Sequence, residues 1–305
     1  MTQILRDTPA TAQLLNYQNG DLTNFDATPS LAVTDGNGAT VTTEAVSSPG
    51  TGIYQAIIPG QTNVSMLKAV WTAAMSTRTV VHTVWYEVVA HTLADEAWIR
   101  SYGAKATGTG PLASATDYTD AMIEEARERA VTRMEDWTER GWIGRYCRIE
   151  AAGTGTRTLW LADGEPRLAD GTSLHRPGRL SDVRKIISAS ADGTALNTSN
   201  LRIDSSVGAV YRTDADWPSA TSSNPRNIVI EYEYGLSGPQ DGSERVLMAL
   251  VAADLVPSLV SDRAMSMSTE FGIERYVTAG FGNAVTSLPE VNAWVLQHTR
   301  HLPVA

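Results

Sequence analysis

The sequence predicts an α+β protein, in which a β-sandwich precedes a small helical bundle with a β-rich insertion and an extended C-terminal arm ending in a helix. Three observations predict this fold. Residues 1–90 are rich in Thr, Val and Ala, and turn signals divide them into short segments. Residues 93–142 carry apolar side chains at helical spacing. Residues 145–235 return to short β-type segments, and a second apolar helix follows them. We therefore expect one domain at 1–90 and a second at 91–305.

The first 90 residues alternate between turns and short apolar segments. Turn signals rich in Gly, Asn, Asp and Pro lie at 19–21, 35–38 and 49–52. Short strands at regular spacing between such turns are typical of a β-sandwich. A lipocalin-like barrel is the alternative, although the segment has few strands with which to close one. The expected strands are 12–17, 31–34, 53–58, 66–72 and 80–89.

Residues 93–142 predict two helices. The first is short, at 93–100, and the second begins at Asp117 or Thr119, either of which can cap it, and stops before Gly141. Apolar residues three or four apart form one stripe along the second helix, and acids and bases alternate on its other faces. Those faces are either solvated or in contact with a neighbouring subunit. The expected stripe is Tyr118, Met122, Ala126, Ala130, Met134 and Trp137.

Residues 145–235 predict a β insertion between two helical segments. The clearest strand is 227–234, which alternates from Ile230 and ends before Gly235. Helices at 93–142 and 243–260 can pack on each other, so we treat the strands between them as an excursion from one helical core. The other expected strands are 146–150, 158–161, 183–189, 201–203 and 209–211.

The C-terminal arm, residues 262–305, has two parts. Residues 262–284 mix Gly, Ser and Thr with scattered aromatic residues, and we expect an extended arm or a hairpin there. A final helix is expected to begin at Ser287, because 287–290 has a capping-box pattern with proline in the first turn.

Composition limits the classes of function. The chain has 24 Lys and Arg against 34 Asp and Glu, a formal net charge of -10. Tight DNA binding is not expected, since it relies on Lys and Arg at the phosphates. The acidity serves solubility, or it lines a channel that DNA passes without sticking. Cys147 is the only cysteine, which excludes an intrachain disulfide and a Cys-rich metal site. No apolar run has the length of a bilayer, and the N-terminus lacks a signal-peptide pattern.

From residue 93 onward, the order of elements resembles the head-to-tail connector (adaptor) proteins of tailed bacteriophages. The resemblance covers residues 93–305, and it rests on pattern and order with no invariant motif. Four segments carry it: the short helix from Leu93-Ala94-Asp95-Glu96, the helix end at 137–142, the strand 230–235 with the Ala/Leu-rich helix after it, and the segment 288–296.

The resemblance implies a structural protein of the virion neck, assembled in the host cytoplasm. Such a protein forms a homo-oligomeric ring, here expected to be a dodecamer, below the portal, and joins the portal to the tail. The genome would pass through the ring during ejection without specific binding. The implied partners are the portal protein, neighbouring copies of the chain, and head-tail stopper or tail proteins, with no membrane. Residues 1–90 resemble the immunoglobulin-like modules that phages add to structural proteins.

The C-terminal arm supplies the expected partner-binding residues. An apolar but irregular arm is poorly stable alone, and Trp is enriched at interfaces. We expect these residues to dock on the portal or a neighbouring subunit, and folding back on the chain's own core is the alternative. Deleting residues 286–305 is then expected to leave the fold intact and abolish attachment to portal-bearing capsids. The expected residues are Phe271, Tyr276, Phe281, Val291, Trp294, Val295 and His298.

The sequence favours a structural role over an enzyme, and no cofactor is expected. Gly-x-Ser-x-Gly, His-Glu-x-x-His and phosphate-loop patterns are absent from it. Asp214 and Asp216 lie in a turn-like segment where ordinary solvation is expected, and His298 and His301 have no third ligand nearby for a metal. A hydrolase using acids of the β stretch remains an alternative.

A further alternative is a virion decoration or tail protein that binds carbohydrate through the N-terminal sandwich. Trp71, Trp85 and Tyr86 motivate this hypothesis, because aromatic side chains are common in carbohydrate sites.

Overall fold

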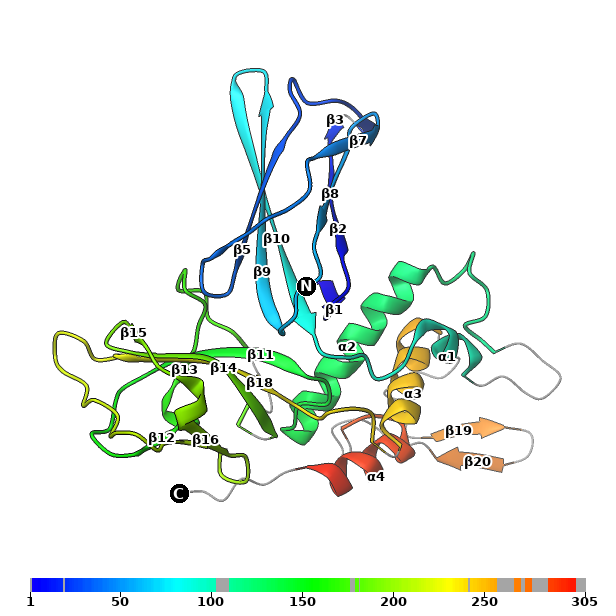
Figure 1. The fold of residues 1–305 in the computed structure, drawn as a ribbon. Helices are drawn as coiled ribbons and strands as arrows, with labels where there is room; N and C mark the ends of the chain where they lie inside the picture. Colours follow the sequence, from blue (N-terminus) through cyan, green and yellow to red (C-terminus); the bar gives the residue numbers. More distant parts are fainter. Residues whose placement is uncertain are drawn as a thin grey trace. The chain divides into compact units, whose positions relative to one another are not determined.

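The structure is a computed structural model, and it describes residues 2–18, 20–102, 110–175, 179–180, 182–240, 242–256, 266–269, 272–275 and 285–299. Strands in several sheets and a group of helices confirm the α+β class (Figure 1). Contacts between residues divide the chain into two compact units. The first combines Met1–His91 with Gly144–Gly235, and the second combines Thr92–Ile143 with Leu236–Ala305. The expected division into domains at 1–90 and 91–305 stays a prediction.

The N-terminal part of the first unit is a sandwich of two sheets around one core. Trp71, Leu67 and Val88 from one sheet and Tyr54 and Ile58 from the other belong to the same buried cluster. Alternation of apolar and polar residues along the strands points one face of each sheet inward. One sheet has the order β1 (Thr2–Leu5), β10 (Arg78–Val89), β9 (Ser65–Met75), β5 (Ser30–Asp35) and β6 (Thr40–Val41). The other has the order β2 (Ala10–Leu15), β8 (Ile53–Ile58) and β7 (Ser47–Gly50). A separate short pair is formed by β3 (Tyr17–Gln18) and β4 (Asp21–Leu22).

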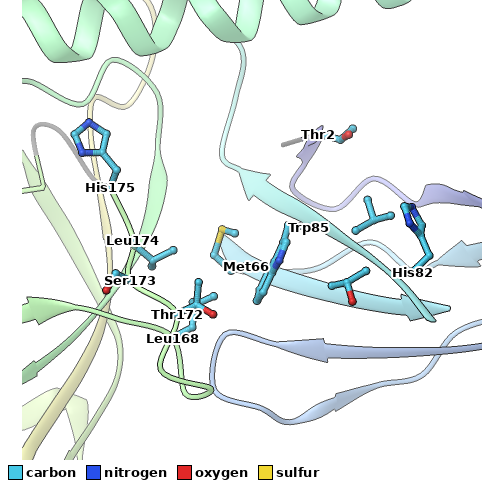
Figure 2. A pocket seen from close by; sticks show the side chains of 11 residues that line it. Thr2, Met66, His82, Trp85, Leu168, Thr172, Ser173, Leu174 and His175 are labelled. Carbon is cyan, nitrogen blue, oxygen red and sulfur yellow. The ribbon is translucent and has the colours of Figure 1, made fainter. Parts of the chain in front are cut away.

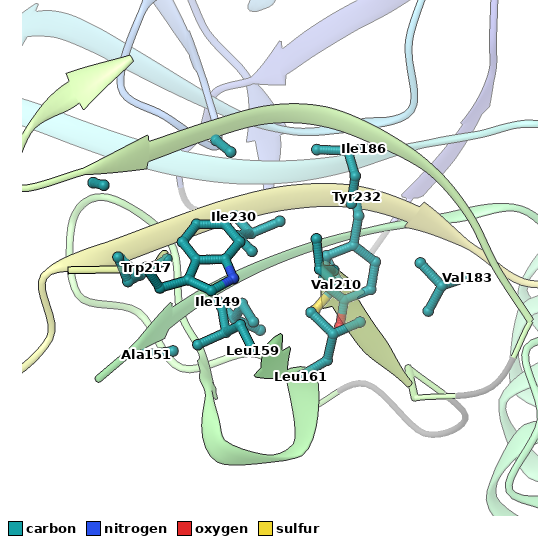
Figure 3. Close-up of a cluster of buried hydrophobic side chains, with 14 of the residues drawn as sticks. Ile149, Ala151, Leu159, Leu161, Val183, Ile186, Val210, Trp217, Ile230 and Tyr232 are labelled. Carbon is teal, nitrogen blue, oxygen red and sulfur yellow. The ribbon is translucent and has the colours of Figure 1, made fainter. Parts of the chain in front are cut away.

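The insertion also has two sheets, which share a core around Trp217 (Figure 3). Its central strand, β18 (Ile228–Tyr234), pairs with a strand on each side and is buried at six of seven positions. One of its faces lies in this core, and Glu231 and Glu233 on the other face contact residues of the sandwich. The larger sheet has the order β13 (Glu165–Pro166), β11 (Arg145–Ala151), β18, β14 (Val183–Ala191) and β15 (Thr194–Ala195). The smaller has β12 (Thr158–Trp160), β17 (Ala209–Arg212) and β16 (Leu201–Asp204), with single 3-10 turns at Leu161–Asp163 and Thr198–Asn200.

Buried polar contacts and a small apolar cluster join the sandwich to the insertion within the first unit. The carboxylate of Glu231 in β18 accepts hydrogen bonds from Tyr146 and Ser188 of the insertion, and from Asn37 Nδ2 of the sandwich at 2.9 Å. Glu87 of β10 forms a buried ion pair with Arg145 of β11. The sequence did not predict these contacts, since they join residues far apart in the chain. The apolar cluster is Val64, Met66, Tyr146, Leu168 and Leu174.

The second unit contains the helices, α1 (Glu96–Ser101), α2 (Asp120–Thr138), α3 (Ser243–Leu255) and α4 (Pro289–His298). Thr119 caps α2 by accepting from the N–H of Met122 at 3.3 Å, which decides between the two caps expected from the sequence. The expected hairpin is present as β19 (Ser266–Thr269) paired antiparallel with β20 (Gly272–Arg275). The backbone N–H of Leu236 donates to the carbonyl of Gly141 at 3.0 Å, so the chain returns from the insertion to the point where it left the helices.

The buried face of α2 is rotated from the expected stripe. Met122, expected inside, is 41% exposed, and its neighbour Ile123 is buried instead. Ala126, Ala130 and Met134 are buried as expected. The expected stripe was wrong at Met122, because residues 122 and 123 are both apolar and lie about 100° apart around a helix, so spacing alone does not choose between them. Glu135 is buried too, because its carboxylate accepts the backbone N–H of Trp142 at 3.1 Å. The helix ends at Glu139, whose φ of 53° is left-handed, before the expected stop at Gly141.

Candidate functional site

The C-terminal helix is held in the second unit by a polar clamp at its start. Asn292 is buried, and its Oδ1 accepts the backbone N–H groups of Val285 and Thr286, both at 2.9 Å. Its Nδ2 donates to the carbonyl of Thr286 at 2.8 Å. The expected capping box is not formed, because the N-cap residue is Leu288 and it makes no side-chain cap bond. Asn292 instead fixes the segment that leads into the helix, through its bonds to Val285 and Thr286.

An aromatic stack fixes α4 to the end of α2. The ring centroids of Trp294 and Trp142 lie 4.5 Å apart, and the ring of His298 stacks on that of Trp294 with the two centroids 4.6 Å apart. The indole N–H of Trp142 donates to Thr138 Oγ1 at 2.7 Å, and this fixes the ring that receives α4. Tilted and stacked aromatic pairs stabilise beyond their buried area.

The expected partner-binding residues therefore lie against the chain's own helices. Val291 is 0%, Trp294 6% and Val295 5% exposed, and His298 is half-buried. This arrangement is the alternative considered above, folding back on the own core. Docking of these side chains on a partner stays a prediction, and it requires α4 to leave this packing. Phe271, Tyr276 and Phe281 lie outside the described residues.

The burial of α4 also changes the expected effect of a truncation. Removing residues 286–305 would expose Trp142, which is fully buried, together with the apolar face that α4 covers. Exposure of that much apolar surface costs stability. We therefore expect the truncated chain to be destabilised, in contrast to the expectation from the sequence.

A cavity of about 350 Å³ opens between α2, α3 and the segment before α4. Trp137, Leu250 and Asp254 line it, together with Arg133, Ala253 and residues 285–288. Asp254 receives hydrogen bonds from Arg129 at 2.6 Å and from Arg133 at 3.3 Å. Burial raises the pKa of Asp254, but the two guanidinium groups outweigh burial and hold it below its usual value. The two arginines are thus occupied within the chain, which leaves less of the α2 face for a neighbouring subunit.

The exposed face of α4 is the part that a partner could contact without unfolding the helix. Leu296 is 63% exposed, and Glu290, Ala293 and Gln297 lie on the same exposed side. Glu290 forms an ion pair with Arg245 of α3 at 3.2 Å. A large exposed apolar side chain next to small and polar neighbours is a feature of interface patches, although one such residue alone is ordinary.

The acids singled out in the sequence are engaged in ion pairs. Arg212 Nη2 lies 3.0 Å from Asp214, and a hydrogen bond from Arg212 holds the pKa of Asp214 below its usual value. Asp216 lies 3.7 Å from Arg157. In the part of the chain that the structure describes, no three His, Cys, Asp or Glu side chains group as metal ligands, and His301 lies outside it. No described helix is long and apolar enough to cross a membrane.

Only one of the three aromatic residues proposed for carbohydrate binding is accessible. Trp71 and Tyr86 lie in the sandwich core, with 0% and 6% exposure. Trp85 is half-buried on the other face of β10, where it lines a cavity of about 580 Å³ (Figure 2). The carbohydrate hypothesis was therefore wrong for the two core residues. Alternation along a strand sends neighbours such as Trp85 and Tyr86 to opposite faces.

Comparisons with known proteins give a distant likeness to solved structures. No known family and no curated protein matches the chain. A solved structure described as "Neck of empty GTA particle computed with C6 symmetry" is similar with a TM-score of 0.38 and 15% identity, over 55% of this chain and 82% of that chain. A likeness at that TM-score carries no argument about function.

Proposed function

We propose that the chain is a structural head-to-tail connector of a tailed phage or a phage-like particle. The observation that carries the proposal is the order of elements in the helical unit. Helices α1 and α2 precede a β insertion, the chain returns to α3 beside its point of departure, and a hairpin and the terminal helix α4 follow. This order is the one through which residues 93–305 resemble the connectors, and it supports a ring below the portal.

The charge of the helical unit supports a position around a DNA channel. This unit has 10 Lys and Arg against 17 Asp and Glu, so it carries -7 of the chain's net charge of -10. A negative surface repels phosphates and lets DNA pass without binding. In the proposed assembly the partners are neighbouring copies of the chain, the portal, and stopper or tail proteins. The genomic DNA passes through the channel without specific binding.

We also propose that the role is structural and not enzymatic. Its support is the absence of catalytic sequence patterns and the pairing of Asp214 and Asp216 with arginines. Paired, ionised carboxylates at a surface are poor general acids. A hydrolytic activity that depends on either carboxylate would contradict this proposal.

The test is attachment to portal-bearing capsids that lack tails. The full chain should co-sediment with such capsids, even if it is monomeric alone. Leu296→Asp changes the exposed face of α4 and should abolish co-sedimentation without unfolding the chain. Trp160→Asp, at a side chain of the insertion that is 42% exposed, is the matched control and should still attach. If Leu296→Asp attaches as well as the control, the portal contact does not involve α4.

A further inference from the structure

The cavity beside Trp85 has walls from two parts of the first unit. One wall is the start of β9 and the middle of β10, with Met66 and Trp85, and the other is formed by Leu168 and residues 172–175 of the insertion (Figure 2). Pockets of 300–1,000 Å³ with a mainly apolar lining and a few polar groups are the usual form of small-ligand sites. At about 580 Å³ the cavity is within that range.

The wall contributed by the insertion is held in place by several contacts. Lys68 Nζ lies 2.6 Å from Asp170 Oδ2, and the backbone N–H of Ala169 donates to the carbonyl of Gly36 at 3.0 Å. Within the segment, Leu168 donates to the carbonyl of Thr172 at 2.9 Å. The turn is therefore fixed both to itself and to the sandwich, so a ligand would meet a preformed wall.

Lys68 also orients the indole of Trp85. Its Nζ lies 5.3 Å from the ring centroid, and Lys68 is not among the residues that line the cavity. The indole of Trp85 is a flat apolar surface in the lining of the cavity, and its contact with Lys68 restrains its position.

The chemistry of the lining selects a neutral, amphipathic ligand. Met66, Trp85, Leu168 and Leu174 are apolar, and the hydroxyls of Thr83, Thr172 and Ser173 with the imidazoles of His82 and His175 supply hydrogen-bonding groups. Among the described residues that line the cavity, none is Asp, Glu, Lys or Arg. A charged ligand would lose hydration here without gaining a carboxylate, ammonium or guanidinium partner from these lining residues.

We propose that this cavity binds a neutral pyranose unit of a glycan, with Trp85 stacking on the C–H face of the sugar ring. A pyranose has one face of C–H groups and a rim of hydroxyls, which matches a cavity lined by an indole and by the hydroxyls of Thr83, Thr172 and Ser173. The site is shared by the sandwich and the insertion, so it differs from a site on the sandwich alone. It is independent of the connector role.

The test is a titration of the full chain with neutral disaccharides of glucose, galactose, mannose and N-acetylglucosamine, followed by saturation-transfer NMR. At least one should bind saturably, and a disaccharide containing glucuronic acid should bind more weakly. Trp85→Ala should weaken binding about tenfold or more, and Trp160→Ala, the same change at another accessible Trp, should leave it unchanged. Ser173→Ala, which removes one hydroxyl and little packing, should weaken binding about fivefold.

Three results would overturn the proposal. The first is no saturable binding of any neutral disaccharide by the folded chain at tens of millimolar. The second is equal binding by Trp85→Ala and the wild type. The third is binding of extended peptides in place of sugars, along the edge of β10 that β1 leaves unpaired before Tyr86. The Ser173→Ala variant keeps the test decisive if Trp85→Ala does not fold.

Discussion

At the scale of single residues, the buried carboxylate of Glu231 links distant parts of the first unit. Glu231 is 6% exposed, and its carboxylate accepts from Tyr146, Ser188 and Asn37. Leaving a buried acceptor short of a donor costs more than the bond itself contributes. The three donors lie in three separate stretches of the sequence, and no local sequence pattern indicates that they meet at Glu231. Sequence alone therefore could not predict it.

Tyr146→Phe should lower the free energy of unfolding by about 1–3 kcal/mol, because the buried Oε1 of Glu231 loses the hydroxyl of Tyr146 as its donor. Urea unfolding measures the change. Tyr211→Phe is the control, since no hydrogen bond of its hydroxyl is seen in the described structure and its loss should cost less than about 0.5 kcal/mol. Equal costs for the two variants would contradict the assignment of Tyr146 to this network.

Stability should fall in alkaline solution. Burial raises the pKa of Tyr86, Tyr146 and Tyr232 in the folded chain above the ordinary value. In the unfolded chain the tyrosines lose their protons near pH ~10, before those of the folded chain do. Their contribution to stability is therefore complete below that pH, and it is lost as the pH rises from there through the raised pKa of the folded chain. Urea midpoints from about pH 9 to about pH 11 should decline, and the decline should be smaller in Tyr146→Phe. An equal decline in that variant would count against a raised pKa at Tyr146.

Trp294 and Leu296 lie two residues apart on α4 and should behave differently. Trp294→Ala removes a buried ring from the stack on Trp142 and should cost about 3–5 kcal/mol. Leu296→Ala, at an exposed side chain, should cost less than about 0.5 kcal/mol. Chemical denaturation of both variants checks this. Similar costs would mean that α4 is not docked on α2 in solution.

At the scale of elements, strands and helices with a clear apolar period could be predicted from the sequence, but the strands that pair with them in space could not. β8 was expected at 53–58 and is observed at those residues, and α4 is present where proline and the apolar spacing indicated it. β1 was missed, because four residues with one buried side chain show no alternation. Its parallel pairing with β10 brings together residues more than 80 positions apart, which no local signal encodes.

The tip of the β5–β6 hairpin contacts the insertion through Gly36 and Asn37. A Cβ at Gly36 would lie 2.6 Å from the hydroxyl oxygen of Tyr146. Gly36→Ala should therefore cost about 1–3 kcal/mol through overpacking. Gly50→Ala is the matched control, since its Cβ would meet only Ile53 at an ordinary 3.5 Å, and the change should be nearly neutral. Thermal unfolding of both variants tests this, and a neutral Gly36→Ala would show that the tip is not seated on Tyr146.

At the scale of the whole molecule, the contacts give N-terminal residues a definite structural role. The sequence suggested an added module of unassigned purpose, whereas the structure seats that module on the insertion through Glu231, Glu87 and the cluster around Met66. A connector with this construction would carry its sandwich as part of the same unit as its insertion. The helical unit, with most of the negative charge, is the part proposed to form the ring.

Electron microscopy of tailless, portal-bearing capsids incubated with an excess of the chain tests the central claim most directly. The connector role predicts a closed ring of added density below the portal, with one helical unit and one β unit in each subunit. A map whose portal is unchanged, with the folded chain remaining in solution, would contradict it.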